Sequence, residues 1–346
     1  MTGKIGWGQL GIVLALSRIF SEAANFPSDD INYGMQRFTV IVLSYLLLLI
    51  VLVPLVLMAR RYPEIFTLRD KWGGAVVSVY LVLGAVSTFT RLQFYSASTI
   101  FDAAPPWLII IFVSVVCLYG LFKGTPAVLR TGVIAAAGFV VLLITVIIGI
   151  SDDINLNYLY PALVDKPRTL FGDVMAEFSK NAEGVIFAAV LPSVREKAER
   201  ALYISIPVSL SVLLLMTFLY NTVLGEYLDV TNFPFYALAS LSDISVLQRL
   251  DGIDVVVWIM GAVIKLSLLM LSVFHITVST TGNRRTGYIF SCTALGITTA
   301  CTLYFSINTA DFIVFSRLME TGIPFFTAVF VVPMALWLIR RERKNA

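Results

Sequence analysis

Long apolar stretches recur along the whole chain and leave no polar segment large enough to form a soluble domain. An α-helix needs about 20 mostly apolar residues to cross the hydrocarbon core of a bilayer. In lipid, a helix also satisfies its backbone hydrogen bonds internally. We therefore predict an all-α polytopic membrane protein, a single membrane domain over residues 1–346. The ten predicted spans are 7–25, 38–58, 73–99, 107–122, 127–150, 170–192, 201–224, 253–279, 286–307 and 322–339.

Composition and the distribution of basic residues agree with this class. Charged residues make up 14% of the chain, against about 25% in ordinary soluble domains. Of the Lys and Arg residues, 16 fall in the termini and the loops on the terminal side of the predicted membrane, and 5 in the loops on the other side. Basic loops stay in the cytoplasm, so we predict that both termini are cytoplasmic. Arg18 interrupts the first apolar stretch, which argues against a cleaved signal peptide.

The sixth predicted span is unusual because its first half carries Asp173, Glu177, Lys180 and Glu183. A charged residue at the centre of a membrane helix costs about 3 kcal/mol and usually faces a protein interior or a water-filled cavity. One interpretation is that these charges face a cavity and that the helix breaks near Asn181 to Gly184, exposing backbone groups to a ligand. The other is that the helix starts later and that the first three charges lie in an outer re-entrant or interfacial turn.

The remaining intramembrane charges suggest an internal repeat. Arg18 and Glu22 lie in the first span, Arg91 in the third and Lys265 in the eighth. If residues 7–150 and 170–340 are two five-helix copies, the first span corresponds to the sixth and the third to the eighth. Every charged span then has a charged counterpart. An odd number of helices per copy makes the copies inverted, an arrangement that places a transporter's binding site near the bilayer midplane.

We predict one polar site between the first, third, sixth and eighth spans. The candidate ligand-binding residues are Arg18, Ser21, Glu22, Arg91, Tyr95, Lys180, Asn181, Glu183, Gly184 and Lys265. Ser21 begins a weak point in the first span, residues 21–25, that would match the break in the sixth. Lys265 has no acid within one helical turn, so we expect a partner on another helix or a bound anion. The intramembrane bases outnumber the acids, which suits a ligand with a carboxylate, such as an amino acid.

Two structural alternatives remain open for these residues. Arg18 and Glu22 lie four residues apart on one helix face, where they could form an ion pair that only fixes helix packing. Arg91 could instead extend to the outer interface, as long basic side chains do near the ends of membrane helices. The single histidine, His275, lies off the Lys265 face, and we expect it to pack rather than to relay protons.

The sequence gives no support for an enzyme, a metal or a cofactor. Cys117, Cys292 and Cys301 lie in apolar spans without a CxxC pair or a histidine cluster, which disfavours metal and disulfide chemistry. We find no convincing nucleophile and no His–carboxylate pair at helical spacing. A nucleic-acid partner is not expected because the chain has no basic soluble region.

The longest predicted loop, residues 225–252, contains a short amphipathic pattern. Phe235, Leu238, Leu241 and Leu247 fall largely on one helical face, and the opposite face is polar. We predict a short helix lying on the extracellular surface. It would act either as a lid or as a connector.

This loop also carries a family resemblance. The run FPFYALASLSDISVLQRLDGIDVVVWIMGAVIKLS, with Pro234, Arg249, Asp251, Trp258 and Lys265, resembles the spore germination permease family, whose members form the membrane-embedded B subunit of germinant receptors. Further similar runs are Gln9 and Leu10 before the first span, RRYPEIFTL after the second and IRRERK at the end of the tenth. This family belongs to the amino acid, polyamine and organocation transporter superfamily.

The resemblance implies the five-plus-five inverted repeat, an amino acid or similar nutrient as ligand, and a site between the first, third, sixth and eighth spans. It also implies receptor A and C subunits as partners in the spore inner membrane, or otherwise a location in the bacterial cytoplasmic membrane. The first span reads SRIFSEAANFP, without the glycine-rich break of many superfamily members, so we expect Arg18 rather than the backbone to meet the ligand. The leading hypothesis is a germinant receptor subunit. The alternative is a proton-coupled secondary amino-acid transporter, with the proton on Glu22 or Glu183.

Overall fold

The computed structural model describes residues 5–23, 35–61, 66, 71–99, 105–159, 167–194, 197–229, 231–242 and 251–345. These residues form helices joined by short connections and contain no strand, with an isolated parallel bridge between Ile5 and Val194. Seven of the described helices are long and apolar enough to cross a membrane, and a bent pair of helices raises the number to eight. The protein is therefore an integral membrane protein built from helices.

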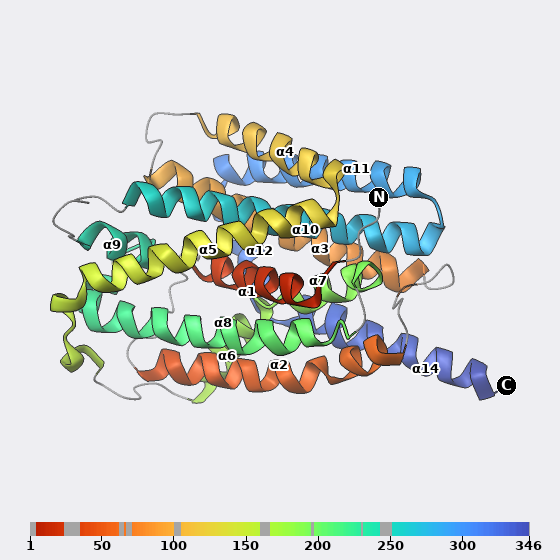
Figure 1. Ribbon diagram of the computed structural model, residues 1–346, viewed down its shortest axis with the longest axis horizontal. Coiled ribbons are helices and arrows are strands. Elements are labelled where there is room, and N and C mark those ends of the chain that lie inside the picture. Colours follow the sequence, from red (N-terminus) through yellow and green to blue (C-terminus); the bar gives the residue numbers. More distant parts are fainter. Residues whose placement is uncertain are drawn as a thin grey trace.

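The seven long helices run side by side along the long axis of the molecule (Figure 1). They are α2 (Met35–Arg61), α3 (Lys71–Thr99), α4 (Pro106–Lys123), α5 (Thr125–Gly149), α8 (Arg200–Leu219), α10 (Asp251–Thr281) and α11 (Arg284–Ile307). After its last residue, α8 continues into a π-helical turn, η4 (Tyr220–Leu224), and a 3-10 turn, η5 (Gly225–Asp229). Two further 3-10 turns, η1 (Ser151–Asp153) and η2 (Leu156–Leu159), follow α5.

The sixth predicted span is a broken helix. The first part, α6 (Pro167–Ser179), is separated from α7 (Glu183–Val190) by residues 180–182, and a 3-10 turn, η3 (Leu191–Ser193), follows α7. The side-chain amide of Asn181 donates to the carbonyls of Glu177 and Phe178, both at 3.2 Å. Both carbonyls also accept a backbone N–H, from Lys180 and Asn181 at 3.3 Å, so the amide adds a second bond to carbonyls that have lost their helical partners at the end of α6. The predicted break is confirmed, one residue earlier than expected, and the alternative of a later helix start is wrong because α6 already begins at residue 167.

The C-terminal part differs from the prediction of a loop at 308–321 followed by one span. Residues Thr309–Glu320 form a helix, α12, and the chain then bends by 46° into the segment Ile323–Ile339. Gly322 sits at the bend with φ of 77°, a conformation that glycine adopts without the steric cost of a Cβ atom. The segment after the bend consists of α13 (Ile323–Phe326), the π-helical turn η6 (Thr327–Val331) and α14 (Val332–Asn345). Pro333 has no N–H to donate to the preceding turn, which explains why the helix widens immediately before it.

The predicted short helix in the 225–252 loop is present as α9 (Pro234–Leu241). Phe235 and Leu238 on this helix are buried, whereas Leu241 is exposed. The helix packs against α5, α10 and η4. Residues 243–250, which include Leu247 and Arg249, lie outside the described residues.

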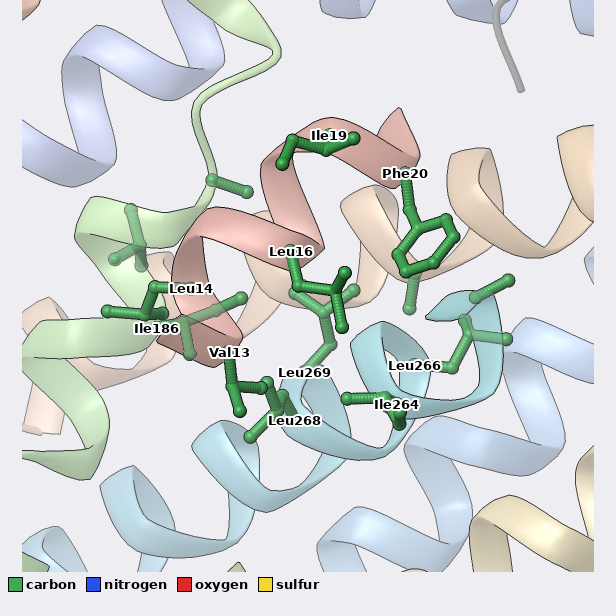
Figure 2. Packing of buried hydrophobic residues seen from close by; sticks show 14 of the residues in the cluster. Val13, Leu14, Leu16, Ile19, Phe20, Ile186, Ile264, Leu266, Leu268 and Leu269 are labelled. Carbon is green, nitrogen blue, oxygen red and sulfur yellow. The ribbon is translucent and has the colours of Figure 1, made fainter. Parts of the chain in front are cut away.

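The core forms around α10, which packs against α1 (Trp7–Ala23), α3, α4, α5, α7, α9 and α11. Figure 2 shows Val13 and Leu16 of α1 facing Leu268 and Leu269 of α10. The two helices approach closely at Gly261, where an added Cβ would lie 1.8 Å from the ring of Phe20. The start of α1 is joined to the end of η3, because the backbone N–H of Ile5 donates to the Ser193 carbonyl at 3.2 Å. This packing brings α1, α3, α7 and α10 together in the interior.

Candidate functional site

Five charged side chains from three helices form an ion cluster of buried and partly buried groups: Arg18 and Glu22 of α1, Arg37 of α2, and Glu177 and Lys180 of the α6 region. Arg18 and Glu177 are each 1% exposed and contact each other directly. Arg37 contacts Glu22 and donates to Glu177 Oε2 at 2.8 Å. Lys180 Nζ lies 3.4 Å from Glu22 and 3.3 Å from Glu177. The cluster therefore ties α1, α2 and α6 to one another.

The predicted pairing of Arg18 with Glu22 is present, at 3.6 Å, but it is only one contact of this larger cluster. The predicted second span began at residue 38 and left Arg37 in a loop, whereas α2 begins at Met35 and Arg37 lies in its first turn. Nothing in the spacing of the sequence relates Arg37 to carboxylates 15 and 140 residues away. Arg37 is therefore a charged residue of the site that sequence reasoning missed.

A second buried pair joins α1, α7 and α10. Lys265 Nζ on α10 lies 3.0 Å from Glu183 Oε1 on α7. It also contacts the Ser21 hydroxyl and lies 3.3 Å from the Ser17 carbonyl oxygen, both on α1. The Ser17 hydroxyl donates to the same Glu183 oxygen at 2.8 Å. The prediction that Lys265 has a partner on another helix is confirmed.

The first helix does not contain the weak point predicted at residues 21–25, as far as the structure describes it. Helix α1 continues through Ser21 and Glu22 to Ala23, and residues 24 and 25 lie outside the described part of the chain. The Ser21 hydroxyl bonds to the Ser17 carbonyl within the helix, at 3.2 Å. Helix α1 therefore contributes side chains to the site from a continuous helix, whereas the helix is interrupted between α6 and α7.

A cavity of about 80 Å³ lies between α1, α3, α10, α12 and the break after α6. Five of the ten predicted residues line it: Ser21, Arg91, Tyr95, Lys180 and Lys265. A cavity needs at least about 10 to 15 Å³ to hold one water molecule, so this cavity is several times larger than a single water requires. That is the scale of a small polar metabolite.

Four other predicted residues, Arg18, Asn181, Glu183 and Gly184, line a separate space of about 20 Å³ between α1, α2, α7 and α8. Arg18 Nε donates to Asn181 Oδ1 there, at 3.2 Å. A Cβ at Gly184 would lie 2.8 Å from Leu52 Cδ2, which indicates that this glycine permits close helix packing. The tenth residue, Glu22, belongs to the ion cluster. The structure therefore divides the predicted site into a cavity wall and a layer of ion pairs behind it.

The alternative interpretation was that Arg91 extends to the outer interface. Instead, Arg91 contacts α12. Its guanidinium lies 2.9 Å from the Ser316 hydroxyl and 3.1 Å from Glu320 Oε1, and Arg91 is 9% exposed. Met319 and Glu320 of α12 line the cavity together with Arg91. Sequence reasoning missed both because it assigned residues 308–321 to a loop.

Aromatic side chains cover one side of the cavity. Phe20 packs edge-on against Trp258 with ring centroids 4.6 Å apart, and Tyr95 lies 6.3 Å from Trp258. The Tyr95 hydroxyl donates to Asp254 Oδ2 at 3.0 Å, which orients its ring. The faces of tyrosine and tryptophan rings attract cations. His275, in contrast, bonds to Thr125 at 2.8 Å and does not line the cavity, as expected.

The cavity wall carries more basic than acidic side chains, and each of its basic side chains is paired with a carboxylate. Among the described residues that line it, Arg91, Lys180 and Lys265 are basic and Glu320 is acidic. Ser21, Ser87 and Thr88 add hydroxyl groups. Such a wall suits a small ligand that carries both an anionic and a cationic group. Within the described residues, no group of three or more His, Cys, Asp or Glu side chains is arranged to hold a metal ion.

Comparison with known proteins identifies the family. No curated protein matches the chain. The family described as "Spore germination protein" matches residues 39–311, from α2 to the start of α12. The match includes Arg91, Lys180, Glu183 and Lys265, and it spans well over half of the chain. The chain is therefore an integral membrane protein of the spore germination protein family.

Proposed function

We propose that this protein binds a small amino acid, or a similar nutrient, in the cavity between α1, α3, α10 and the break after α6, and acts as the membrane subunit of a germinant receptor. The observation that supports this proposal best is the cavity wall, where three basic side chains, one acidic side chain and an aromatic surface meet. Membership of the spore germination family supports the sensing role. We propose no catalytic activity for the chain.

An amino acid matches this wall group by group. Its carboxylate would interact with Lys180, Lys265 and the Ser21 hydroxyl, because charge-assisted hydrogen bonds to carboxylates are strong. Its ammonium group would interact with Glu320 and with the faces of Tyr95 and Trp258. The small volume of the cavity favours amino acids with short side chains.

The proposed topology has ten spans, with both termini in the cytoplasm and two inverted repeats at about 7–150 and 170–340. The seven long helices and the bent pair account for eight crossings. Helix α1, with 17 residues, and the broken α6–α7 segment would supply the other two. The ion pair of Arg18 with Glu177 joins the two helices that would be counterparts in this repeat.

Binding would favour one arrangement of the two repeats over another, since a ligand shifts a conformational equilibrium by its difference in affinity for the two states. In a receptor, partner A and C subunits would detect this shift. The protein would then reside in the spore inner membrane. The alternative location is the bacterial cytoplasmic membrane.

Proton-coupled transport is the alternative, and the contact between Lys265 and Glu183 is the observation that favours it. A ligand carboxylate could replace Glu183 as the partner of Lys265. Glu183, no longer paired with Lys265, would be the carboxylate that carries the proton in this alternative. Glu22 is less suited to this role because Arg18, Arg37 and Lys180 all surround it.

Uptake by the purified chain in proteoliposomes separates the two functions. Binding can be followed by thermal stabilisation with glycine, L-alanine and L-leucine, and with two analogues of alanine, namely propionate and L-alaninol, which lack the ammonium and carboxylate groups respectively. Binding without uptake of labelled amino acid supports the receptor. Uptake driven by a proton gradient would instead establish the transporter, and absence of binding by every compound would refute an amino-acid site.

A further inference from the structure

A groove on the outer surface of the helix bundle lies between α2 and α8, outside the central cavity; it shares Leu52, Leu202 and Ile206 with the space of about 20 Å³ behind the cavity wall. Its volume is about 180 Å³. Seven apolar side chains line it: Leu49, Leu52, Val53, Val56, Leu57, Leu202 and Ile206. Two polar residues complete the lining, Arg60 and Tyr203, and both are exposed. The groove is therefore apolar along its length and polar at one end.

The length of the groove matches one leaflet of a bilayer. The lining residues of α2 recur three or four positions apart from Leu49 to Arg60 and so follow one face of the helix. At 1.5 Å per residue this stripe is about 16 Å long. Half of the roughly 30 Å hydrocarbon core is about 15 Å. A groove of this length can hold one acyl chain of a lipid in a single leaflet.

The polar end of the groove lies where membrane-interface residues gather. Arg60 is in the last turn of α2, and Tyr203 is in the first turn of α8. Arg200, one turn before Tyr203, stacks over the ring of Trp7 with 5.6 Å between its guanidinium carbon and the ring centre. Tryptophan, tyrosine and arginine concentrate at the headgroup level of bilayers. The end of the groove is therefore at the level of lipid phosphates.

The chemistry at this end selects an anionic group. Arg60 donates one hydrogen bond to the Tyr203 hydroxyl, at 2.8 Å. A guanidinium has five N–H donors, and its planar shape matches a phosphate oxygen pair. The Tyr203 bond orients the guanidinium beside the groove and leaves the phenol hydrogen free to donate. Basic pockets between membrane helices on the cytoplasmic side bind anionic lipid headgroups in this way.

We propose that the groove between α2 and α8 binds an anionic phospholipid, with one acyl chain along the stripe from Leu49 to Leu57 and its phosphate on Arg60 and Tyr203. This lipid is a structural ligand that holds the exposed faces of α2 and α8 together. The proposal requires only that the protein spans a membrane, and it is independent of the ligand in the central cavity.

Native mass spectrometry of the purified full chain tests the proposal by counting phospholipids that remain bound. Phosphatidylglycerol and phosphatidylcholine of the same acyl length are supplied in competition. The wild-type chain is expected to retain one phosphatidylglycerol in preference to phosphatidylcholine. Arg60→Gln removes charge-assisted bonds and is expected to lower the affinity for phosphatidylglycerol by about tenfold or more. Val53→Trp fills the groove and is expected to remove both lipids.

Arg130→Gln is the matched control, because Arg130 is an exposed arginine in the first turns of α5 and does not line the groove. It is expected to bind phosphatidylglycerol as the wild-type chain does. The proposal would be overturned if both Arg→Gln variants lost bound phosphatidylglycerol equally. It would also be overturned if neither Arg60→Gln nor Val53→Trp lost any. Displacement of the lipid by soluble glycerol phosphate at the same concentration would also overturn it, because the occupant would then be a free phosphate. A dimer that Val53→Trp dissociates would overturn it too, because the occupant would then be a second copy of the chain.

Discussion

Lys265 on α10 and Glu183 on α7 form a buried ion pair, with 3.0 Å between Lys265 Nζ and Glu183 Oε1, at the edge of the candidate cavity. Lys265 belongs both to the cavity wall and to the contacts that hold α1, α7 and α10 together. A ligand that contacts Lys265 therefore acts directly on the packing of the broken helix. If a ligand binds as proposed, this relationship would couple binding to a change in helix arrangement.

Lys265→Met is expected to abolish stabilisation by both L-alanine and propionate, because both compounds need a cation for their carboxylate. The single change also leaves Glu183 buried without its cation, which costs about 3 to 5 kcal/mol in comparable cases. The double variant Lys265→Met with Glu183→Gln is expected to recover most of the stability of the free protein without recovering ligand stabilisation. Thermal unfolding with and without ligand checks both statements, and ligand stabilisation in the double variant would exclude Lys265 from the site.

Glu320→Gln is expected to weaken L-alanine binding by about tenfold, since it removes the carboxylate that would contact the ammonium group. Binding of propionate, which has no ammonium group, is expected to stay the same or to strengthen. Asp311→Asn is a control on the same helix, because Asp311 is exposed and bonds to Tyr304 instead of lining the cavity. Calorimetric titrations of the three proteins give the comparison. An equal loss for both compounds in Glu320→Gln would contradict the assigned role.

Arg18→Met is expected to destabilise the protein by about 3 to 5 kcal/mol, because it leaves Glu177 buried beside fewer cations. Glu177→Gln together with Arg18→Met removes both buried charges and is expected to cost less than Arg18→Met alone. Thermal unfolding in detergent measures the difference. If the double variant were the less stable of the two, the cluster would contribute through contacts other than this ion pair.

Gly261→Ala is expected to displace the Phe20 ring, since an added Cβ would lie 1.8 Å from it. Phe20 is buried against Trp258 and lines the cavity, so its displacement changes the shape of the binding wall. Compared with the wild-type chain, we expect Gly261→Ala to lose more of the stabilisation by L-leucine than of the stabilisation by glycine. Gly84→Ala is the matched control, because Gly84 also lines the cavity and an added Cβ there meets no atom within 4 Å. Equal effects of the two variants would show that Phe20 does not shape the cavity.

Several features of the protein could be predicted from local sequence alone. Apolar stretches of sufficient length identified the membrane helices, because the hydrocarbon thickness sets the length of a span. Charges within such stretches indicated an interior site, since ions avoid lipid. The break after α6 was also predictable, because Asn181 and the charged residues around it interrupt the apolar run and the Asn181 side chain competes for backbone groups.

The tertiary structure alone decided which charges meet. Arg37 reaches Glu177 across 140 residues of sequence, and Arg91 reaches Glu320 across 229. Such pairs leave no periodic pattern, because the distance between the helices depends on packing rather than on spacing along the chain. The bend at Gly322, which follows the end of α12 at the cavity, likewise depends on one residue's backbone conformation. The sequence by itself thus determined the membrane class and the location of the polar helices, whereas the fold determined the partners of each charge and the composition of the cavity wall.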